Sequence, residues 1–362
     1  MFKFNQLKSI HFEISNNCQA SCPMCTRNIH GGVENPLLEI ENWTIERFKT
    51  AISPEVIHQV HKLYFCGNFG DPIINKDLVD MCAYAKEIKS TIQIRIHTNG
   101  SARSKAWWIR LAQSLPEDHA VVFAIDGLSD THSLYRIGTN YETILENARA
   151  FINAGGRAEW AFIRFKHNEH QVEEARAIAK ATGFETFTMK DSSRFLLDPK
   201  FPVWNDKKET IYHLEPSTYS EMKFIDRKVL SNYKEIIGAM TIDCYVQHER
   251  EVYLDAKGHL LPCCWLGSIP YIPIDHEGLA VPVKQEMLNQ YHDLVYNLGG
   301  LQKLDIMNNS LKDIIDSPEY QGVWDEYWNE KKLITCARAC GKSAEKIIST
   351  PNDQFVASET LQ

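Results

Sequence analysis

The sequence predicts an α/β protein whose first half is a parallel sheet or barrel, and two observations support that prediction. Over about 190 residues, short strand-like runs alternate with helix-like runs in six successive units. The composition, with 44% hydrophobic and 24% charged residues, is typical of a well-cored globular chain. Strands separated by helices form parallel sheets with right-handed crossovers, so we expect functional loops at the carboxyl ends of the strands.

The predicted elements follow in a regular order, with apolar runs as strands and three- to four-residue apolar spacing as helices. The predicted strands are residues 9–15, 62–66, 92–97, 120–126, 158–165 and 184–189. The predicted helices are residues 44–52, 76–88, 101–115, 141–154 and 170–182. Gly183 closes the last of these helices.

The pattern changes after Lys190, where a loop-rich stretch begins. Residues 251–262 predict a β-hairpin, and residues 285–297 and 311–327 predict helices. The tail from residue 350 is polar, and we expect it to be flexible. The chain then divides into four predicted segments, namely a barrel (1–200), a bridging segment (201–240), an auxiliary domain (241–349) and a tail (350–362).

Charge and hydropathy exclude several classes of protein. The 362 residues include 39 Lys and Arg against 47 Asp and Glu, so the net charge of −8 disfavours a long nucleic-acid partner. No run of about eighteen apolar residues predicts a membrane span, and residues 1–10 lack the apolar core of a secretory signal. We therefore expect a cytoplasmic protein, in which ten cysteines are not a disulfide framework.

Three cysteines stand close together directly after the first predicted strand, namely Cys18, Cys22 and Cys25. Thiolates are the usual ligands of iron–sulfur clusters. Three cysteines leave one iron of a four-iron cluster without a protein ligand, and an open coordination position is typical of catalytic metal sites. Zinc is the alternative, but it would need a fourth ligand, for which His30 is the local candidate.

The spacing CxxxCxxC after the first strand of a βα series resembles the radical S-adenosylmethionine (SAM) superfamily. This resemblance implies a partial (β/α)6 TIM-like barrel with a [4Fe–4S] cluster on the three cysteines and SAM on the free iron. It also implies that one electron, from an external flavodoxin- or ferredoxin-type donor, cleaves SAM to a 5′-deoxyadenosyl radical. That radical takes a hydrogen atom from the substrate.

Other segments resemble the SAM-binding positions of that superfamily. Met24 stands where a residue packs near the adenine, and the second strand ends in YFCGNFGDP, similar to a Gly-Gly-Glu-Pro segment that binds the SAM amino group. The fourth strand ends in FAIDG and is followed by Arg136, which resembles an arginine that pairs with the SAM carboxylate. A solvated loop position is the alternative for Arg136. The implied SAM-binding residues are Met24, Gly67, Asn68, Gly70, Asp71, Asn99, Asp126 and Arg136.

Five further cysteines lie beyond the predicted barrel. Gly258 stands five residues before Cys263, which resembles the signature of SPASM and Twitch domains. Five cysteines suit the shorter Twitch type, which implies one auxiliary [4Fe–4S] cluster. The implied ligands are Cys244, Cys263, Cys336 and Cys340. Cys264 is the alternative to Cys263, and a structural zinc site is the alternative to the cluster.

Two cysteines remain. Cys82 is expected to be a buried apolar residue of a helix. Cys66 is either a packed strand residue or a thiol that donates a hydrogen atom to a product radical. Candidate acid–base groups at strand ends, each alternatively a surface charge, are His97, Lys166, Lys190, Asp191 and Arg194.

Three functions compete on the sequence alone. The first is a radical SAM maturase that acts on a peptide or protein, with the auxiliary cluster assisting oxidation or substrate positioning. The second is dehydrogenation, epimerisation or rearrangement of a small molecule such as a sugar, aminocyclitol or nucleoside. The third is a non-catalytic iron–sulfur protein that senses redox state or iron.

Overall fold

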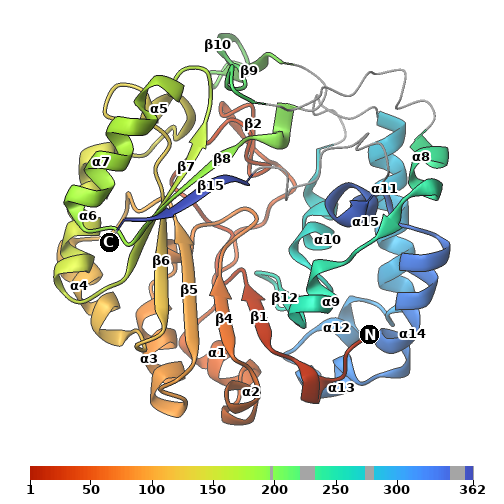
Figure 1. Ribbon diagram of the computed structural model, residues 1–362. Coiled ribbons are helices and arrows are strands. Elements are labelled where there is room, and N and C mark those ends of the chain that lie inside the picture. Colours follow the sequence, from red (N-terminus) through yellow and green to blue (C-terminus); the bar gives the residue numbers. More distant parts are fainter. Residues whose placement is uncertain (196–198, 221–232, 274–280, 343–354, 362) are drawn as a thin grey trace.

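The computed structural model describes residues 1–195, 199–220, 233–273, 281–342 and 355–361 (Figure 1). Its centre is a nine-stranded sheet in the order β13-β12-β1-β4-β5-β6-β7-β8-β15. The strands from β1 to β8 in this order are parallel and follow the chain, as predicted. The sheet does not close on itself, so the architecture is a partial barrel.

The elements of the first half agree with the predicted ones to within a few residues. The strands are β1 (Ser9–Phe12), β4 (Lys62–Phe65), β5 (Gln93–Thr98), β6 (His119–Ala124), β7 (Ala158–Arg164) and β8 (Thr186–Asp191), with a small hairpin of β2 (Asn28–Ile29) and β3 (Val33–Glu34). The helices are α1 (Ile45–Ala51), α2 (Pro54–Gln59), α3 (Leu78–Ile88), α4 (Lys105–Ser114), α5 (His132–Tyr135), α6 (Tyr141–Asn153) and α7 (Val172–Thr182). Side chains of Thr44, Ser53, Ser104 and Asn140 cap four of these helices by accepting a backbone N–H.

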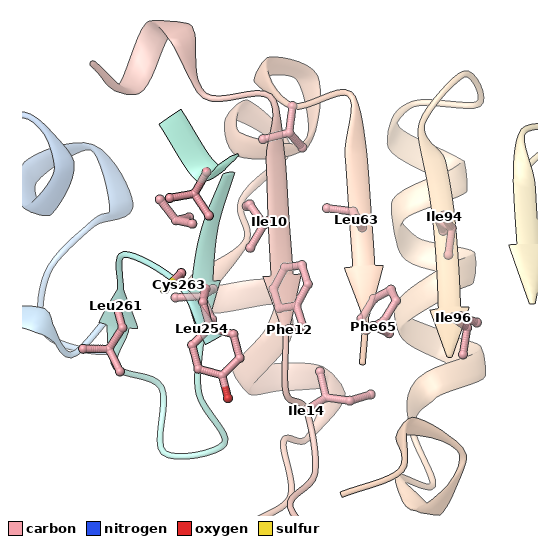
Figure 2. Close-up of a cluster of buried hydrophobic side chains, with 14 of the residues drawn as sticks. Ile10, Phe12, Ile14, Leu63, Phe65, Ile94, Ile96, Leu254, Leu261 and Cys263 are labelled. Atoms are coloured by element: carbon pink, nitrogen blue, oxygen red, sulfur yellow. The ribbon is translucent and has the colours of Figure 1, made fainter. Parts of the chain in front are cut away.

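The two faces of the parallel strands differ in polarity. One face packs an apolar core under the helices, where Figure 2 shows Ile10, Phe12 and Ile14 beside Leu63, Phe65, Ile94 and Ile96. The opposite face carries polar side chains, including His11, Tyr64 and the ion pair between Arg95 and Glu159 at 2.7 Å. Because side chains alternate along a strand, each strand contributes to both faces. The polar face is therefore the one suited to a polar ligand.

The second half adds strands to the same sheet. Its elements are β9 (Phe201–Trp204), β10 (Thr210–Leu214), α8 (Tyr233–Ala239), β11 (Thr241–Ile242), α9 (Tyr245–Glu249), β12 (Glu251–Leu254), β13 (Leu260–Leu261), α10 (Cys264–Ser268), α11 (Val281–Asn297), α12 (Leu301–Leu304), α13 (Leu311–Ile315), α14 (Pro318–Trp324), the π-helical turn η7 (Asp325–Glu330), α15 (Ile334–Cys340), β14 (Gly341–Lys342) and β15 (Phe355–Thr360). The predicted hairpin is present as β12 and β13. However, β12 pairs in parallel with β1, so the hairpin extends the central sheet. No helix among the described residues is long and apolar enough to cross a lipid bilayer.

Three predictions about the second half need correction. The sequence predicts a flexible tail, but residues 355–360 form β15, which pairs antiparallel with β8; residues 350–354 lie outside the described residues. The helix predicted over 311–327 is divided, because Pro318 begins a new helix. The loop-rich bridge contains the β9–β10 hairpin.

Candidate functional site

The three cysteines of the first cluster lie in the loop that follows β1, at the carboxyl end of the parallel strands. Burial raises the pKa of Cys22 to about 11. The positive charge of Arg136 lowers this pKa in part, whereas negative charge on Cys25 raises it further. Burial also raises the pKa of Cys18, with charge on Asp71, Cys22 and Cys25 adding. The mutual influence shows that the three thiols are neighbours. The raised pKa values of Cys18 and Cys22 keep these two thiols protonated near neutral pH, so binding of a metal by them would release protons.

An ion pair between Arg136 and Asp126 stands beside Cys22. The Nε atom of Arg136 lies 2.6 Å from Oδ2 of Asp126, whose side chain is fully buried. The other oxygen, Oδ1, accepts the backbone N–H of Ile163 at 2.5 Å. Held in this way, Arg136 places its Nη1 atom 3.9 Å from Sγ of Cys22. A guanidinium fixed at this position can bind a carboxylate through charge-assisted hydrogen bonds.

A second polar pair stands beside Cys18. Asp71 follows β4 and Asn99 follows β5. Oδ2 of Asp71 accepts both the backbone N–H of Asn99, at 2.7 Å, and its side-chain amide, at 2.6 Å. The same amide nitrogen lies 3.6 Å from Sγ of Cys18. The structure therefore gathers residues that follow β4, β5 and β6 around the cysteine loop.

The two glycines of the loop after β4, Gly67 and Gly70, allow backbone segments to pack closely. A Cβ atom on Gly70 would lie 1.9 Å from the carbonyl oxygen of Ser15, and one on Gly67 would lie 2.5 Å from the carbonyl oxygen of Gly70. The loop after β4 thus packs directly on the chain that leads into the cysteine loop. These contacts explain why glycine is needed at both positions without any ligand.

Glu13 is a site residue that sequence reasoning missed. Its Oε1 accepts the backbone N–H of Phe69 at 2.7 Å and of Gly70 at 3.1 Å, and its Oε2 accepts the hydroxyl of Tyr253 at 2.5 Å. Burial raises the pKa of Glu13 to about 7 against these hydrogen bonds. The available signal was a glutamate inside a strand predicted to be apolar, directly before the cysteine loop.

Asn68 faces the second half of the chain. Its amide donates to the carbonyl oxygen of Cys264 at 2.7 Å and to the hydroxyl of Tyr253 at 3.2 Å. This predicted SAM-binding residue therefore connects the loop after β4 with the segment that holds the auxiliary cysteines.

Met24 lies in a small apolar cluster beside Cys22. The other buried members include Tyr135, Phe165 and Phe195. The carbonyl oxygen of Met24 accepts a hydrogen bond from Nη1 of Arg194 at 2.5 Å, which gives this acid–base candidate a structural contact. The cluster provides an apolar surface of the kind that an adenine ring would pack on.

His30, the candidate fourth zinc ligand, is directed elsewhere. Its Nδ1 atom lies 3.0 Å from the carbonyl oxygen of Pro202, and its ring stacks at 4.1 Å from that of Trp204. Among the described residues, no three His, Cys, Asp or Glu side chains are spaced to hold a single metal ion. The three thiols fit a multi-iron cluster by donor chemistry, since thiolates are its ligands.

Four cysteines of the second half converge. A hydrogen bond with Cys244 raises the pKa of Cys340, and burial raises the pKa of Cys263, with charge on Cys264, Cys336 and Cys340 adding. They come from the residue before α9, the residue before α10 and the two turns of α15. By donor chemistry, four thiolates are the ligand set of a closed iron–sulfur cluster, and this ligand set stays a prediction.

Cys264 is directed away from this group. The backbone at Cys263 is extended, with φ −155° and ψ 164°, so the two adjacent side chains point in different directions. The Sγ atom of Cys264 lies 3.9 Å from the Tyr245 hydroxyl, and burial raises the pKa of this thiol to about 12, with charge on Cys66 contributing. Cys336 and Cys340 therefore influence the thiol of Cys263, whereas Cys66 influences that of Cys264.

The remaining candidates have different surroundings. Burial lowers the pKa of His97 to about 3, so its ring is neutral. Burial raises the pKa of Cys66 to about 11, against a hydrogen bond with Tyr64. Asp191 forms a two-point ion pair with Arg164, with both contacts at 3.0 Å.

The structure places the other two acid–base candidates, Lys166 and Lys190, in different surroundings. Lys166 forms an exposed ion pair with Glu215 at 2.8 Å. Lys190 lies close enough to His97 and Cys66 for its charge to influence both. Cys82 is fully buried in α3, as predicted.

Several solved structures resemble this chain. SuiB of Streptococcus suis bound to S-adenosylmethionine aligns with a TM-score of 0.52 and 14% identity over 88% of this chain and 68% of SuiB. SuiB bound to its precursor peptide SuiA gives a TM-score of 0.51 at 14% identity, over 88% and 67% of the two chains. The protein anSMEcpe with bound AdoMet gives a TM-score of 0.49 at 12% identity, over 87% and 79%. No protein-family model and no curated protein matches the sequence.

At this level of identity, the likeness to SuiB establishes the fold. The chain shares the fold of SuiB, a protein that has been crystallised with S-adenosylmethionine. The resemblance drawn from the cysteine spacing is confirmed at the level of fold.

Proposed function

We propose that this chain is a radical SAM enzyme. Cys18, Cys22 and Cys25 would hold a [4Fe–4S] cluster, which supplies the electron that cleaves bound SAM and starts hydrogen abstraction from the substrate. One observation carries this proposal. The three thiols follow β1 and are flanked by two fixed polar pairs, Asp126–Arg136 beside Cys22 and Asp71–Asn99 beside Cys18.

The protein's own side chains have distinct tasks in this proposal. Arg136, anchored by Asp126, binds the carboxylate of SAM. The apolar cluster around Met24 packs the adenine and excludes water from the reacting atoms. Glu13 and Asp71 hold the loop after β4, whose backbone would bind the amino group of SAM.

The substrate that we propose is a peptide or protein. SuiB, which shares the fold, has been crystallised with a precursor peptide, and this supports a peptide substrate here. The polar face of the sheet carries groups that can hydrogen-bond a peptide, such as Tyr64 and the Arg95–Glu159 pair. A small-molecule substrate is the alternative outcome of the substrate experiment below.

The central test is cleavage of SAM by the reconstituted protein with a chemical one-electron reductant or a flavodoxin-type donor. The wild-type chain should form 5′-deoxyadenosine, and Cys22→Ala should lose this product by at least about a hundredfold because a cluster ligand is missing. Cys82→Ala is the matched control, since Cys82 is buried in α3 away from both cysteine groups. Product formation by Cys22→Ala would overturn the assignment, and a reconstituted cluster without product would favour the non-catalytic sensor.

The substrate is tested by transfer of deuterium. Candidate peptides and small molecules labelled at their carbon–hydrogen bonds are supplied in turn, and deuterium in 5′-deoxyadenosine identifies the donor. We expect label from a peptide. Label from a sugar, aminocyclitol or nucleoside alone would replace the peptide proposal with the small-molecule one.

We also propose an auxiliary [4Fe–4S] cluster on Cys244, Cys263, Cys336 and Cys340. Two clusters predict about eight irons per chain, four in each. The variant Cys18→Ala, Cys22→Ala, Cys25→Ala should keep about four of them. A zinc content of one per chain with about four irons in the wild type would instead support the structural zinc alternative.

A further inference from the structure

Unpartnered donors line the segment that leads to Cys336. Among the described residues, the buried hydroxyl of Tyr320, the indole nitrogens of Trp324 and Trp328 and the hydroxyl of Thr335 have no hydrogen-bond partner. Buried polar groups in proteins are rarely left in this state, because an unpaired group loses its hydrogen bonds to water and gains none in return. Several unpaired donors on one short segment indicate that an acceptor belongs beside them.

Tyr320 is the donor whose surroundings are defined best. It is fully buried in α14, with no exposed surface. Burial raises its pKa, and charge on Cys263 and Cys244 raises it further, so both thiols lie within electrostatic range of the hydroxyl. The ring of Trp324 lies edge-on to that of Tyr320 with the ring centres 6.5 Å apart, and the tilted ring of Trp328 lies 3.9 Å from that of Trp324. These contacts keep the phenol from turning toward solvent.

We propose that the Tyr320 hydroxyl donates a hydrogen bond to a sulfur atom of the auxiliary cluster and thereby raises its reduction potential. This inference rests on the proposed auxiliary cluster. Reduction adds negative charge to a cluster, and a hydrogen bond to its sulfur stabilises that charge. A cluster of this kind has thiolate and sulfide acceptors, which would satisfy the donor that the protein alone leaves unpaired.

The test uses the full-length chain with Cys18→Ala, Cys22→Ala and Cys25→Ala, so that only the auxiliary cluster remains. Its potential is measured by a redox titration followed by electron paramagnetic resonance. Tyr320→Phe should shift the reduction equilibrium about tenfold toward the oxidised form, which is 59 mV for one electron. Tyr327→Phe is the matched control, because the Tyr327 hydroxyl already donates to Asp293 at 2.6 Å.

A second variant tests the same idea without removing the hydroxyl. Replacement of Tyr320 by 3,5-difluorotyrosine makes the hydroxyl a stronger donor at nearly the same volume, so the potential should rise. If both variants carry about four irons and have the wild-type potential, the role of Tyr320 is overturned while the cluster stands. If the triple-alanine chain binds no iron, the proposed auxiliary cluster itself is overturned.

Discussion

The side chain of Glu13 positions the loop after β4. Its carboxyl group accepts two backbone N–H groups of that loop and the Tyr253 hydroxyl, so one buried side chain sets the position of a segment from the first half and a strand from the second. The cost is electrostatic, since burial raises the pKa of the carboxyl to about 7. The charged form is therefore disfavoured in the folded protein.

Replacing Glu13 by Gln should remove a pH dependence of stability. The folded pKa is about 7 and the unfolded value 4.5, so the stabilising effect of the protonated group is fully present below pH 4.5 and is lost as pH rises through 7. Over that window, the unfolding free energy of the wild type should fall by about 3 kcal/mol relative to Glu13→Gln. Denaturant unfolding at pH 4.5 and pH 8 measures the difference. The exposed Glu87→Gln provides the control, and parallel profiles for Glu13→Gln and the wild type would contradict the prediction.

At the scale of elements, the loop after β4 depends on contact between two backbones. Gly70→Ala should destabilise the protein by about 1–3 kcal/mol, because the added methyl group meets the Ser15 carbonyl oxygen. Gly322→Ala is the opposite case. A methyl group added at this position of α14 would meet open space, and alanine favours a helix over glycine by up to about 1 kcal/mol. The melting temperature of Gly70→Ala should fall and that of Gly322→Ala should rise. Shifts of the same sign would contradict this account of Gly70.

The last strand, β15, should protect the edge of the sheet. Five residue pairs join it to β8, and the backbone N–H of Leu361 donates to the carbonyl oxygen of Glu185 at 2.9 Å. Removal of residues 355–362 should speed hydrogen exchange of the β8 amides about tenfold or more, because an exposed edge loses its partners. The amides of β4, at the centre of the sheet, serve as the internal reference. Unchanged exchange in β8 would show that β15 is dispensable.

The pattern of apolar residues within short segments predicted the six parallel strands. It did not predict that β12 and β15 flank them in the same sheet. The apolar spacing of a helix such as α3 is visible within eleven residues. The pairing of β12 with β1, and of β15 with β8, depends on backbone hydrogen bonds between distant segments, which no local pattern reports. The spacing of the cysteines predicts two ligand groups, whereas the different directions of Cys263 and Cys264 depend on the extended backbone at Cys263. Pro318 could have predicted the division of the helix expected over 311–327, because proline is favoured at the start of a helix.

At the scale of the whole molecule, one sheet joins the two cysteine groups. Glu251 of β12 accepts a hydrogen bond from Ser9 of β1 at 2.7 Å and lies 3.4 Å from Nζ of Lys62 in β4. Asn68 adds a contact from the loop after β4 to the segment of Cys264. The two cysteine groups are therefore connected by contacts within and beside one sheet.

The whole chain should therefore unfold in a single transition. The double variant Cys336→Ala, Cys340→Ala should lose about half of the iron and lower the midpoint of one common melting transition, because a group bound only to the folded chain stabilises it. Cys264→Ala is the control, since this cysteine stands outside the converging set. Differential scanning calorimetry gives the result, and two separate transitions in the double variant would show that the halves are independent.

The position of β12 also has a consequence for synthesis of the chain. Ser9 and Glu251 are 242 residues apart but occupy neighbouring strands. At about 5–20 residues per second, the ribosome needs about 10–50 seconds to deliver the partner of β1 after β1 itself emerges. During that interval the growing chain exposes one open edge directly beside the first cysteine group. The edge of β1 that β12 later covers thus finds its partner only after β4 to β8 have been made.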